Sequence, residues 1–171
     1  HSLCAKRTNK VIEDTRYRDV QTFGRWLNIL DIKFAFILNH LYLTGIKMHS
    51  FLMITDFSSS IFNNANLVFS NFYMSTFKNT SFNNAHLNRV NFESSVLDDA
   101  NFTEANLERA SLKSAIVKGV CFKSANLEST DFTEAQAENA DFANANLKGT
   151  DFTNANLENA NFEGTNYEAA I

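Results

Sequence analysis

The residue types that most often carry chemistry lack the spacing that chemistry needs in this chain. Four histidines are present, but they show neither the ligand spacing of a metal site nor the pattern of a catalytic triad: His1, His40, His49 and His86. There is no glycine-rich phosphate-binding loop and no paired-cysteine metal motif. We therefore expect no catalytic residue, no cofactor-binding residue and no metal ligand, and the sequence predicts a protein that is not an enzyme.

Three evenly spaced aspartates, Asp131, Asp141 and Asp151, suggest calcium at first sight. The glycine-rich nonapeptide of calcium-binding β-rolls is missing, so we interpret these carboxylates as structural. His86 stands twenty residues from Asn66 and from Asn106, in a series that continues with asparagine. We interpret that series as a ladder of amide side chains with one substitution.

Negative charge is concentrated in the second half of the chain. Residues 91–171 hold 14 acidic and 5 basic side chains, a net charge of −9, whereas residues 1–50 hold 8 basic and 4 acidic side chains, a net charge of +4. A dense negative surface attracts basic partners. The candidate acidic contact face is Glu104, Glu108, Glu128, Asp131, Glu134, Glu138, Asp141 and Asp151. Four lysines dilute it, and Lys118 is spaced to stack between Asp98 and Glu138, so a solvated, solubilising face is the favoured interpretation.

The elements that must position these side chains follow from an unbroken repeat. From Phe51 to Ala170 the 120 residues divide into twenty-four pentapeptides without an insertion or deletion. The second position is Phe or Leu in twenty-one of them, and the fifth is always Ala, Ser, Thr or Val. A period of five fits neither the 3.6 of a helix nor the 2.0 of a strand, so the backbone must turn once per repeat. Such a short, exact period is the signature of a solenoid.

Blocks such as Ala100-Asn101-Phe102-Thr103-Glu104 resemble the A-(D/N)-(L/F)-x-x unit of the pentapeptide-repeat proteins. The resemblance implies an all-β solenoid, a right-handed quadrilateral β-helix with four pentapeptides per coil and the central Phe or Leu pointing inward. About six coils then fit residues 51–170, and residues 1–50 form a separate non-repeat segment.

Residues twenty apart sort by type, as four pentapeptides per coil requires. One column is entirely phenylalanine: Phe62, Phe82, Phe102, Phe122, Phe142 and Phe162. The next column is leucine until its last member: Leu67, Leu87, Leu107, Leu127, Leu147 and Tyr167. Coils about 4.8 Å apart bring the rings of such a column into stacking distance.

The segment before the repeats carries apolar residues at helical spacing from Val20 to Leu41, with a stop at Thr44-Gly45. We expect a helical cap over the first coil, because a solenoid exposes an apolar disc at each end. Two alternatives stay open. Ile32, Ile37 and Tyr42 extend the five-residue register backwards as a degenerate leading coil, and residues 20–43 form a membrane-surface helix. Charged residues interrupt this run, so a spanning helix is not expected.

The function predicted from these features is a non-enzymatic scaffold for a protein partner that the sequence does not identify. Some proteins of the family that this chain resembles mimic DNA and bind type II topoisomerases such as DNA gyrase, so a DNA-mimic regulator is one alternative. The lysines among the acids and the absence of loops between the coils count against it. A membrane-associated module through residues 20–43 is the other. We expect no cofactor and no direct binding of nucleic acid.

The repeats run to Ala170 without a capping sequence, which predicts an apolar end. Resemblance to several pentapeptide-repeat proteins implies pairing through that end, so we expect a two-fold homodimer. Its candidate contacts are Leu157, Phe162, Tyr167 and Ile171. Two cysteines, Cys4 and Cys121, do not indicate a disulfide framework, which favours a reducing, cytoplasmic location. Because the chain begins His-Ser, a targeting segment could be missing from it.

Overall fold

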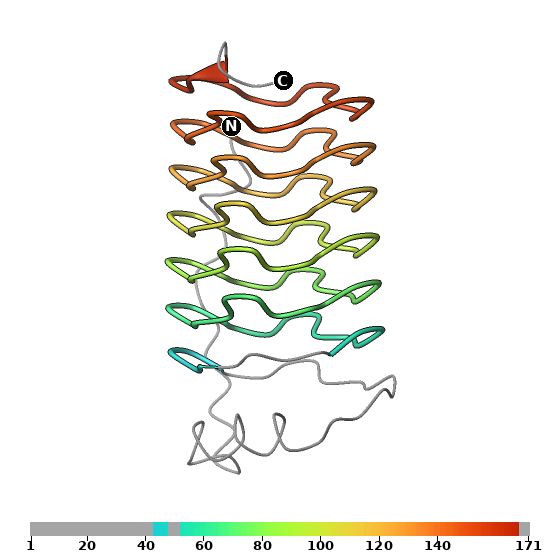
Figure 1. The fold of residues 1–171 in the computed structure, drawn as a ribbon, viewed down its shortest axis with the longest axis vertical. Coiled ribbons are helices and arrows are strands. Elements are labelled where there is room, and N and C mark those ends of the chain that lie inside the picture. The colour runs from blue at the N-terminus through green and yellow to red at the C-terminus, as the bar shows by residue number, and fades with distance from the viewer. Residues whose placement is uncertain (1–42, 48–51, 168–171) are drawn as a thin grey trace.

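The chain forms a β solenoid whose coils stack along one axis, as the computed structural model shows for residues 43–47 and 52–167 (Figure 1). Isolated parallel bridges join first-position residues twenty apart, for example Ile61 with Ser81 and Ser81 with Asn101. Within these described ranges there is no α-helix, and the coils pair through single residues rather than through extended strands. Four pentapeptides therefore make one coil, and the predicted twenty-residue stacking is confirmed.

Backbone hydrogen bonds hold each five-residue turn to its neighbours. The N–H groups of the first, second and fourth positions donate to carbonyls in adjacent coils, and the N–H of the fifth position closes the turn. In repeat 101–105 these bonds run from Asn101 to Thr80 (2.9 Å), from Phe102 to Cys121 (2.7 Å), from Glu104 to Lys123 (2.9 Å) and from Ala105 to Phe102 (3.0 Å). This pattern satisfies the buried backbone without a long strand.

The fourth position of each described repeat adopts a left-handed backbone. Its φ angle is 57° at Asp99, 58° at Glu104 and 57° at Arg109, and glycine takes this place at Gly119 with φ of 63°. Left-handed geometry costs an L-residue on the order of 1–2 kcal/mol, and least for Gly, Asn and Asp. The turn therefore favours short polar residues or glycine at this position.

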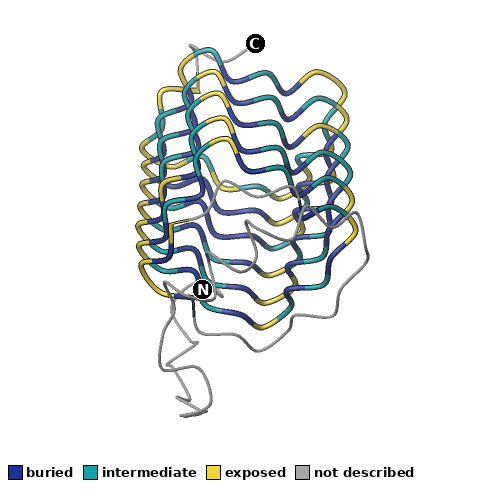
Figure 2. Ribbon diagram, turned by 60° about the horizontal axis from the view of Figure 1, so that its bottom comes forward, coloured by how far each residue is buried: buried dark blue, intermediate teal, exposed yellow. Residues whose placement is uncertain are grey.

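Second-position side chains fill the interior of the solenoid. The rings of the phenylalanine column lie nearly parallel, with centroids 4.7 Å apart between Phe82 and Phe102 and 5.3 Å apart between Phe102 and Phe122. Phe92 meets Phe102 edge-on from the neighbouring column at 6.0 Å. Figure 2 shows buried positions recurring along every coil. The predicted aromatic stacking is confirmed.

Small fifth-position residues let the chain pass close to the core, and their hydroxyls are satisfied there. The Oγ of Ser95 donates to the carbonyl oxygen of Phe72 at 2.7 Å, and the Oγ1 of Thr130 donates to that of Leu107 at 2.9 Å. Both hydroxyl residues are fully buried. Ser and Thr can therefore replace Ala at this position without leaving a buried polar group unpaired.

Residues 43–47 make a further turn of the solenoid, although the sequence analysis placed them in the non-repeat segment. Leu43 donates its N–H to Ile61 at 2.7 Å, Ile46 is buried, and Lys47 bridges Asn66. Leu43 thus takes the second position of this turn. The backward extension of the register would place Tyr42 there, so the observed turn is shifted by one residue. Ile32, Ile37, Tyr42, the expected cap and the membrane-surface helix lie outside the described residues, as does Ile171. No helix within the described ranges could cross a membrane.

Replacing Phe102 with Ala should lower the free energy of unfolding by about 3–5 kcal/mol, because the ring is fully buried between two stacked neighbours and leaves a cavity. The same substitution at Phe162, which is half-buried at the C-terminal end of the column, should cost clearly less. Urea unfolding of both variants makes the comparison. Equal losses would contradict the assignment of a continuous buried column.

Candidate functional site

The outer surface of the solenoid is the candidate functional site, because the interior is filled by apolar side chains. No group of three or more His, Cys, Asp or Glu is placed to hold a metal ion within residues 43–47 and 52–167. The surface has four sides, each built from repeats twenty residues apart. Side A comprises 52–55, 71–75, 91–95, 111–115, 131–135 and 151–155. The next three repeats of each coil form sides B, C and D; after 71–75 these are 76–80, 81–85 and 86–90.

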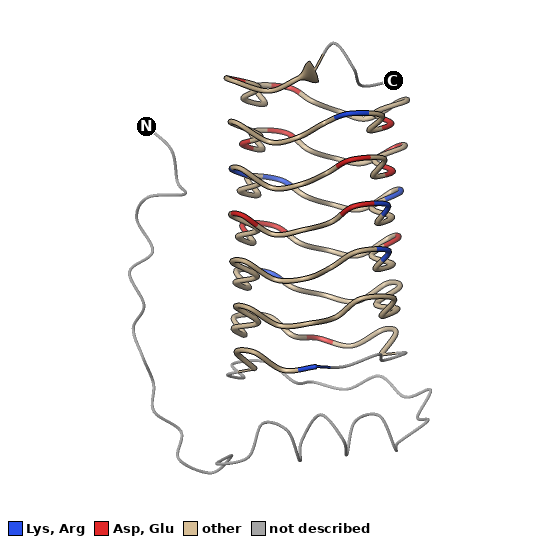
Figure 3. Cartoon of the chain, turned by 60° about the vertical axis from the view of Figure 1, so that its left-hand side comes forward, with Lys and Arg blue, Asp and Glu red and all other residues tan. Residues whose placement is uncertain are grey.

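The eight acidic residues of the predicted contact face are distributed over all four sides. Asp131, Glu134 and Asp151 lie on side A, Glu138 on side B, Glu104 and Asp141 on side C, and Glu108 and Glu128 on side D. Figure 3 shows acidic and basic residues interspersed on the later coils. The structure therefore brings only three of the eight together on one side.

Four of the eight candidate acids, on sides B, C and D, take part in ion pairs. The pairs are Lys118 with Glu138 (2.9 Å), Lys123 with Asp141 (3.2 Å), Lys148 with Glu128 (3.3 Å) and Arg109 with Glu108 (3.6 Å). Such surface pairs contribute little stability, roughly 0–1 kcal/mol each, but they compensate charge. Glu104 and the three candidate acids of side A take part in no ion pair within the described part of the chain, and Glu134 accepts a hydrogen bond from Ser114 at 3.0 Å.

Third-position residues of side B alternate in charge along the solenoid. Lys78 pairs with Asp98 at 3.6 Å, and Lys118 pairs with Glu138 at 2.9 Å. The hydrogen bond from Lys118 holds the pKa of Glu138 below its ordinary value. The expected charge-balancing column is thus present, with Lys118 paired to the coil after it.

First-position acids and amides have a structural role in every coil. The Oδ1 of Asp131 accepts the N–H of Thr133 at 2.8 Å, and the Oδ1 of Asp151 accepts the N–H of Thr153 at 2.8 Å. Hydrogen bonding from Thr153 also lowers the pKa of Asp151. Because the third-position N–H points away from the neighbouring coil carbonyls, a side-chain acceptor two residues earlier satisfies it. These hydrogen bonds support the structural interpretation of Asp131 and Asp151.

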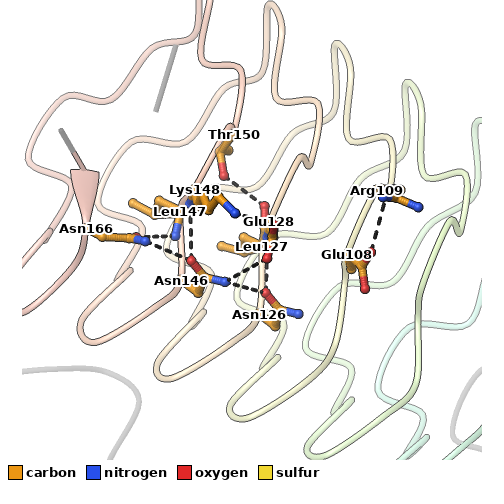
Figure 4. A network of polar contacts seen from close by, with 10 residues as sticks. All are labelled: Glu108, Arg109, Asn126, Leu127, Glu128, Asn146, Leu147, Lys148, Thr150 and Asn166. Carbon is orange, nitrogen blue, oxygen red and sulfur yellow. Dashed lines mark hydrogen bonds and ion pairs between the residues drawn. The ribbon is translucent and has the colours of Figure 1, made fainter. Parts of the chain in front are cut away.

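Side D carries the predicted amide ladder (Figure 4). The Nδ2 of Asn126 donates to the Oδ1 of Asn106 at 3.3 Å, and the Nδ2 of Asn146 donates to Asn126 at 3.0 Å. Asn166 continues the series by donating to Asn146 at 2.8 Å. His86 stands exposed at the lower end of this run. The ladder is confirmed from Asn106 onward.

The last described coil leaves apolar side chains partly uncovered. Leu157 and Phe162 are half-buried against the core, and Tyr167 is 47% exposed. The ring centroids of Phe162 and Tyr167 lie 4.7 Å apart. Three of the four residues of the predicted dimer end therefore lie together at this end.

Cys121 is buried on side C, where its Sγ lies 3.3 Å from the Oγ1 of Thr103. It is not a free thiol in the structure. Cys121 therefore does not support the reducing compartment that we expected from the cysteine content.

A group of apolar residues at turn positions was not predicted from the sequence. Ile54, Phe69 and Met74 are 56%, 58% and 50% exposed, and each occupies the fourth position of its repeat. Reading the fourth position separately from the buried second and fifth positions would have identified them, because other described repeats place polar residues or glycine there.

Comparison with known families places the repeats in two overlapping stretches. Residues 55–132 match the family described as Pentapeptide repeat region, and residues 130–166 match Pentapeptide repeats (8 copies). No curated protein matches the chain in sequence.

Solved structures of repeat proteins are similar to this chain. One is a pentapeptide repeat protein from the Arabidopsis thaliana thylakoid lumen, 32% identical over 54% of this chain, with a TM-score of 0.44; the match spans 61% of the Arabidopsis chain. Another is QnrB1, a plasmid-mediated fluoroquinolone resistance protein, 16% identical over 78% of this chain and 83% of its own, with a TM-score of 0.38. A third is HetL from the cyanobacterium Nostoc sp. strain PCC 7120, a protein involved in heterocyst differentiation regulation. It is 17% identical over 79% of this chain and 86% of its own, with a TM-score of 0.21.

Replacing Lys118 with Met should raise the pKa of Glu138 toward its ordinary value of 4.5, because the lost hydrogen bond is the main cause of the lowering. The folded-state pKa lies below the unfolded one, so the pair stabilises the fold at neutral pH, and that contribution is lost as the pH falls through the folded pKa. Titration of the Glu138 carboxyl by NMR measures the shift. Lys123→Met, on another side, is the control and should leave Glu138 unaffected; no change with Lys118→Met would refute the assignment.

Proposed function

We propose that this chain, which belongs to the pentapeptide-repeat family, is a non-enzymatic scaffold that binds a protein partner on the outer surface of its solenoid. The observation that carries the proposal is the set of acids on side A, Asp131, Glu134 and Asp151, which share one side and have no ion pair in the described chain. Among the other candidate acids, Glu138 on side B and Glu108 and Glu128 on side D are paired with a neighbouring lysine or arginine. Side A is therefore the contact surface that we assign to a basic partner.

The fold supports a scaffold in physical terms. Coil-to-coil hydrogen bonds fix the backbone of every described repeat, so outward side chains recur at about 4.8 Å along each side with little conformational freedom. A partner then meets an ordered row of groups and does not have to order them on binding, which lowers the cost of association. Complementary charge would mainly increase the association rate and the specificity.

The two alternatives receive less support. A DNA mimic needs a dense negative field, and four of the eight candidate acids are neutralised by ion pairs. A membrane-associated module would use residues 20–43, of which only Leu43 belongs to the described chain. Both stay predictions, and the DNA mimic is an outcome of the experiment below.

The finer architecture is also part of the proposal. We assign about six coils of a right-handed quadrilateral β-helix to residues 51–170, and a helical cap over the first coil to the N-terminal segment. The pairing of residues twenty apart supports the coil size. The apolar residues at helical spacing support the cap.

An affinity capture with the full chain tests the acidic surface of side A. The variant Asp131→Asn, Glu134→Gln, Asp151→Asn should lose most of the captured protein partner, because it removes the uncompensated charge while asparagine keeps the turn acceptor. Capture by the unaltered chain should weaken as salt rises. Quantitative mass spectrometry of the eluates provides the measurement.

A control variant with the same change of net charge is Glu108→Gln, Glu128→Gln, Glu138→Gln, which acts on sides B and D. It should keep the partner. Equal loss in both variants would indicate that total negative charge decides binding, as a DNA mimic requires. Equal retention would show that the acids of side A are only solvated.

We also propose that the C-terminal end pairs with a second copy of the chain. Leu157, Phe162 and Tyr167 present apolar surface there, and pairing two such ends would cover it. The negative charge of residues 91–171 opposes the contact, so the dimer should tighten as salt rises.

Sedimentation of the native chain beside Tyr167→Lys tests this end. The native chain should sediment as a dimer, and the lysine should dissociate it by placing a charge in an apolar contact. Lys148→Ala, on side D one coil earlier, is the control and should leave the dimer intact. A monomer at every salt concentration, or a dimer indifferent to Tyr167→Lys, would remove this interface.

A further inference from the structure

Bulky apolar side chains occupy three turn positions at the N-terminal end of the solenoid. We define Ile54, Phe69 and Met74 as the apolar patch. Their φ angles are 57°, 61° and 55°, so all three adopt the left-handed backbone, and each side chain is at least half exposed. Every other described fourth position is Ser, Asn, Asp, Glu, Arg or Gly. A β-branched residue such as Ile54 is especially unfavourable in this conformation.

These residues are not part of the buried core of the solenoid, and the left-handed backbone opposes them. Only Phe69 has a described side-chain contact, with the guanidinium of Arg89 at 5.3 Å from its ring centroid. Strain and exposure at the same apolar residues indicate a contact surface.

The patch flanks side A of the first coils. Ile54 and Met74 are twenty residues apart and stack at the corner that follows side A, and Phe69 lies at the corner that precedes it. Later coils of the Ile54 column carry Ser94 and Ser114. The patch is therefore confined to the end at which the chain enters the solenoid.

We infer that the apolar patch is a docking surface for residues 20–41 of the same chain. This segment carries apolar residues at helical spacing, and it joins the solenoid at Leu43, which is hydrogen-bonded to Ile61 in the first coils. The tether keeps the segment at high effective concentration beside the patch, which favours it over a second copy or a lipid surface.

The segment is long enough to reach the patch. Leu43 is hydrogen-bonded to Ile61 on side C, which is opposite side A. Each side contains five residues and spans at most about 18 Å even if fully extended. A helix over residues 20–41 would be about 33 Å long, so it can cross the open end and continue onto the corners of side A. One segment would then cover both the end disc and the patch.

The one tryptophan of the chain, Trp26, lies in this segment and reports on docking. In the full chain with Ile54→Ser, Phe69→Ser and Met74→Ser, Trp26 emission should shift to longer wavelength, and its quenching by acrylamide should increase severalfold. Serine occupies the same turn position at Ser94 and Ser114, so the solenoid should fold. Circular dichroism of both proteins checks this.

The control variant is Asn64→Ser, Asn84→Ser, Asn139→Ser, which changes the same turn position at other corners and should leave Trp26 unaffected. A photo-crosslinking residue at Met74 provides a second measurement and should capture a peptide from residues 20–41 within one chain. The same residue at Ser114 should not. Identical Trp26 quenching in all three proteins would overturn the proposal, as would a Met74 crosslink only to a second chain or to added phosphatidylserine vesicles.

Discussion

The parallel hydrogen bonds between coils are the constraint on which the rest of the structure depends. They place each residue directly over the residue twenty positions earlier, at the spacing of paired strands. Every column must therefore be compatible with itself. Phenylalanine stacks on phenylalanine, asparagine hydrogen-bonds to asparagine, and lysine alternates with glutamate. The core, the amide ladder and the ion pairs are three solutions to this one requirement.

The same constraint limits where function can be carried. The second and fifth positions are buried, and the first position supplies an acceptor for a backbone N–H, as Asp131 does for Thr133. The fourth position is restricted by its left-handed backbone. Outward third and fourth positions have no such acceptor role, whereas a first-position aspartate such as Asp131 must keep its hydrogen bond to Thr133 while it contacts a partner.

The sequence was sufficient to predict the coil size and the core, because every residue of a column such as that of Phe102 meets the same environment. The acidic site was harder to predict. The density of acidic residues along the sequence groups Glu104 with Asp151, but the coils place these two residues on different sides. Ion pairs such as Lys118 with Glu138 depend in addition on side-chain geometry. The turn at residues 43–47 was not predicted because one residue is lost from the period before Asp56.

The column arrangement has a consequence for how such a chain can change in length. Duplicating twenty residues adds one coil and returns every later residue to its own side, so the core, the ladder and the surface charges keep their neighbours. Duplicating a single pentapeptide preserves the local turn but moves all later residues by a quarter of the circumference, which would place leucine over phenylalanine and separate each lysine from its carboxylate. Growth by whole coils is therefore compatible with an existing binding surface, whereas growth by one repeat replaces it with a different one.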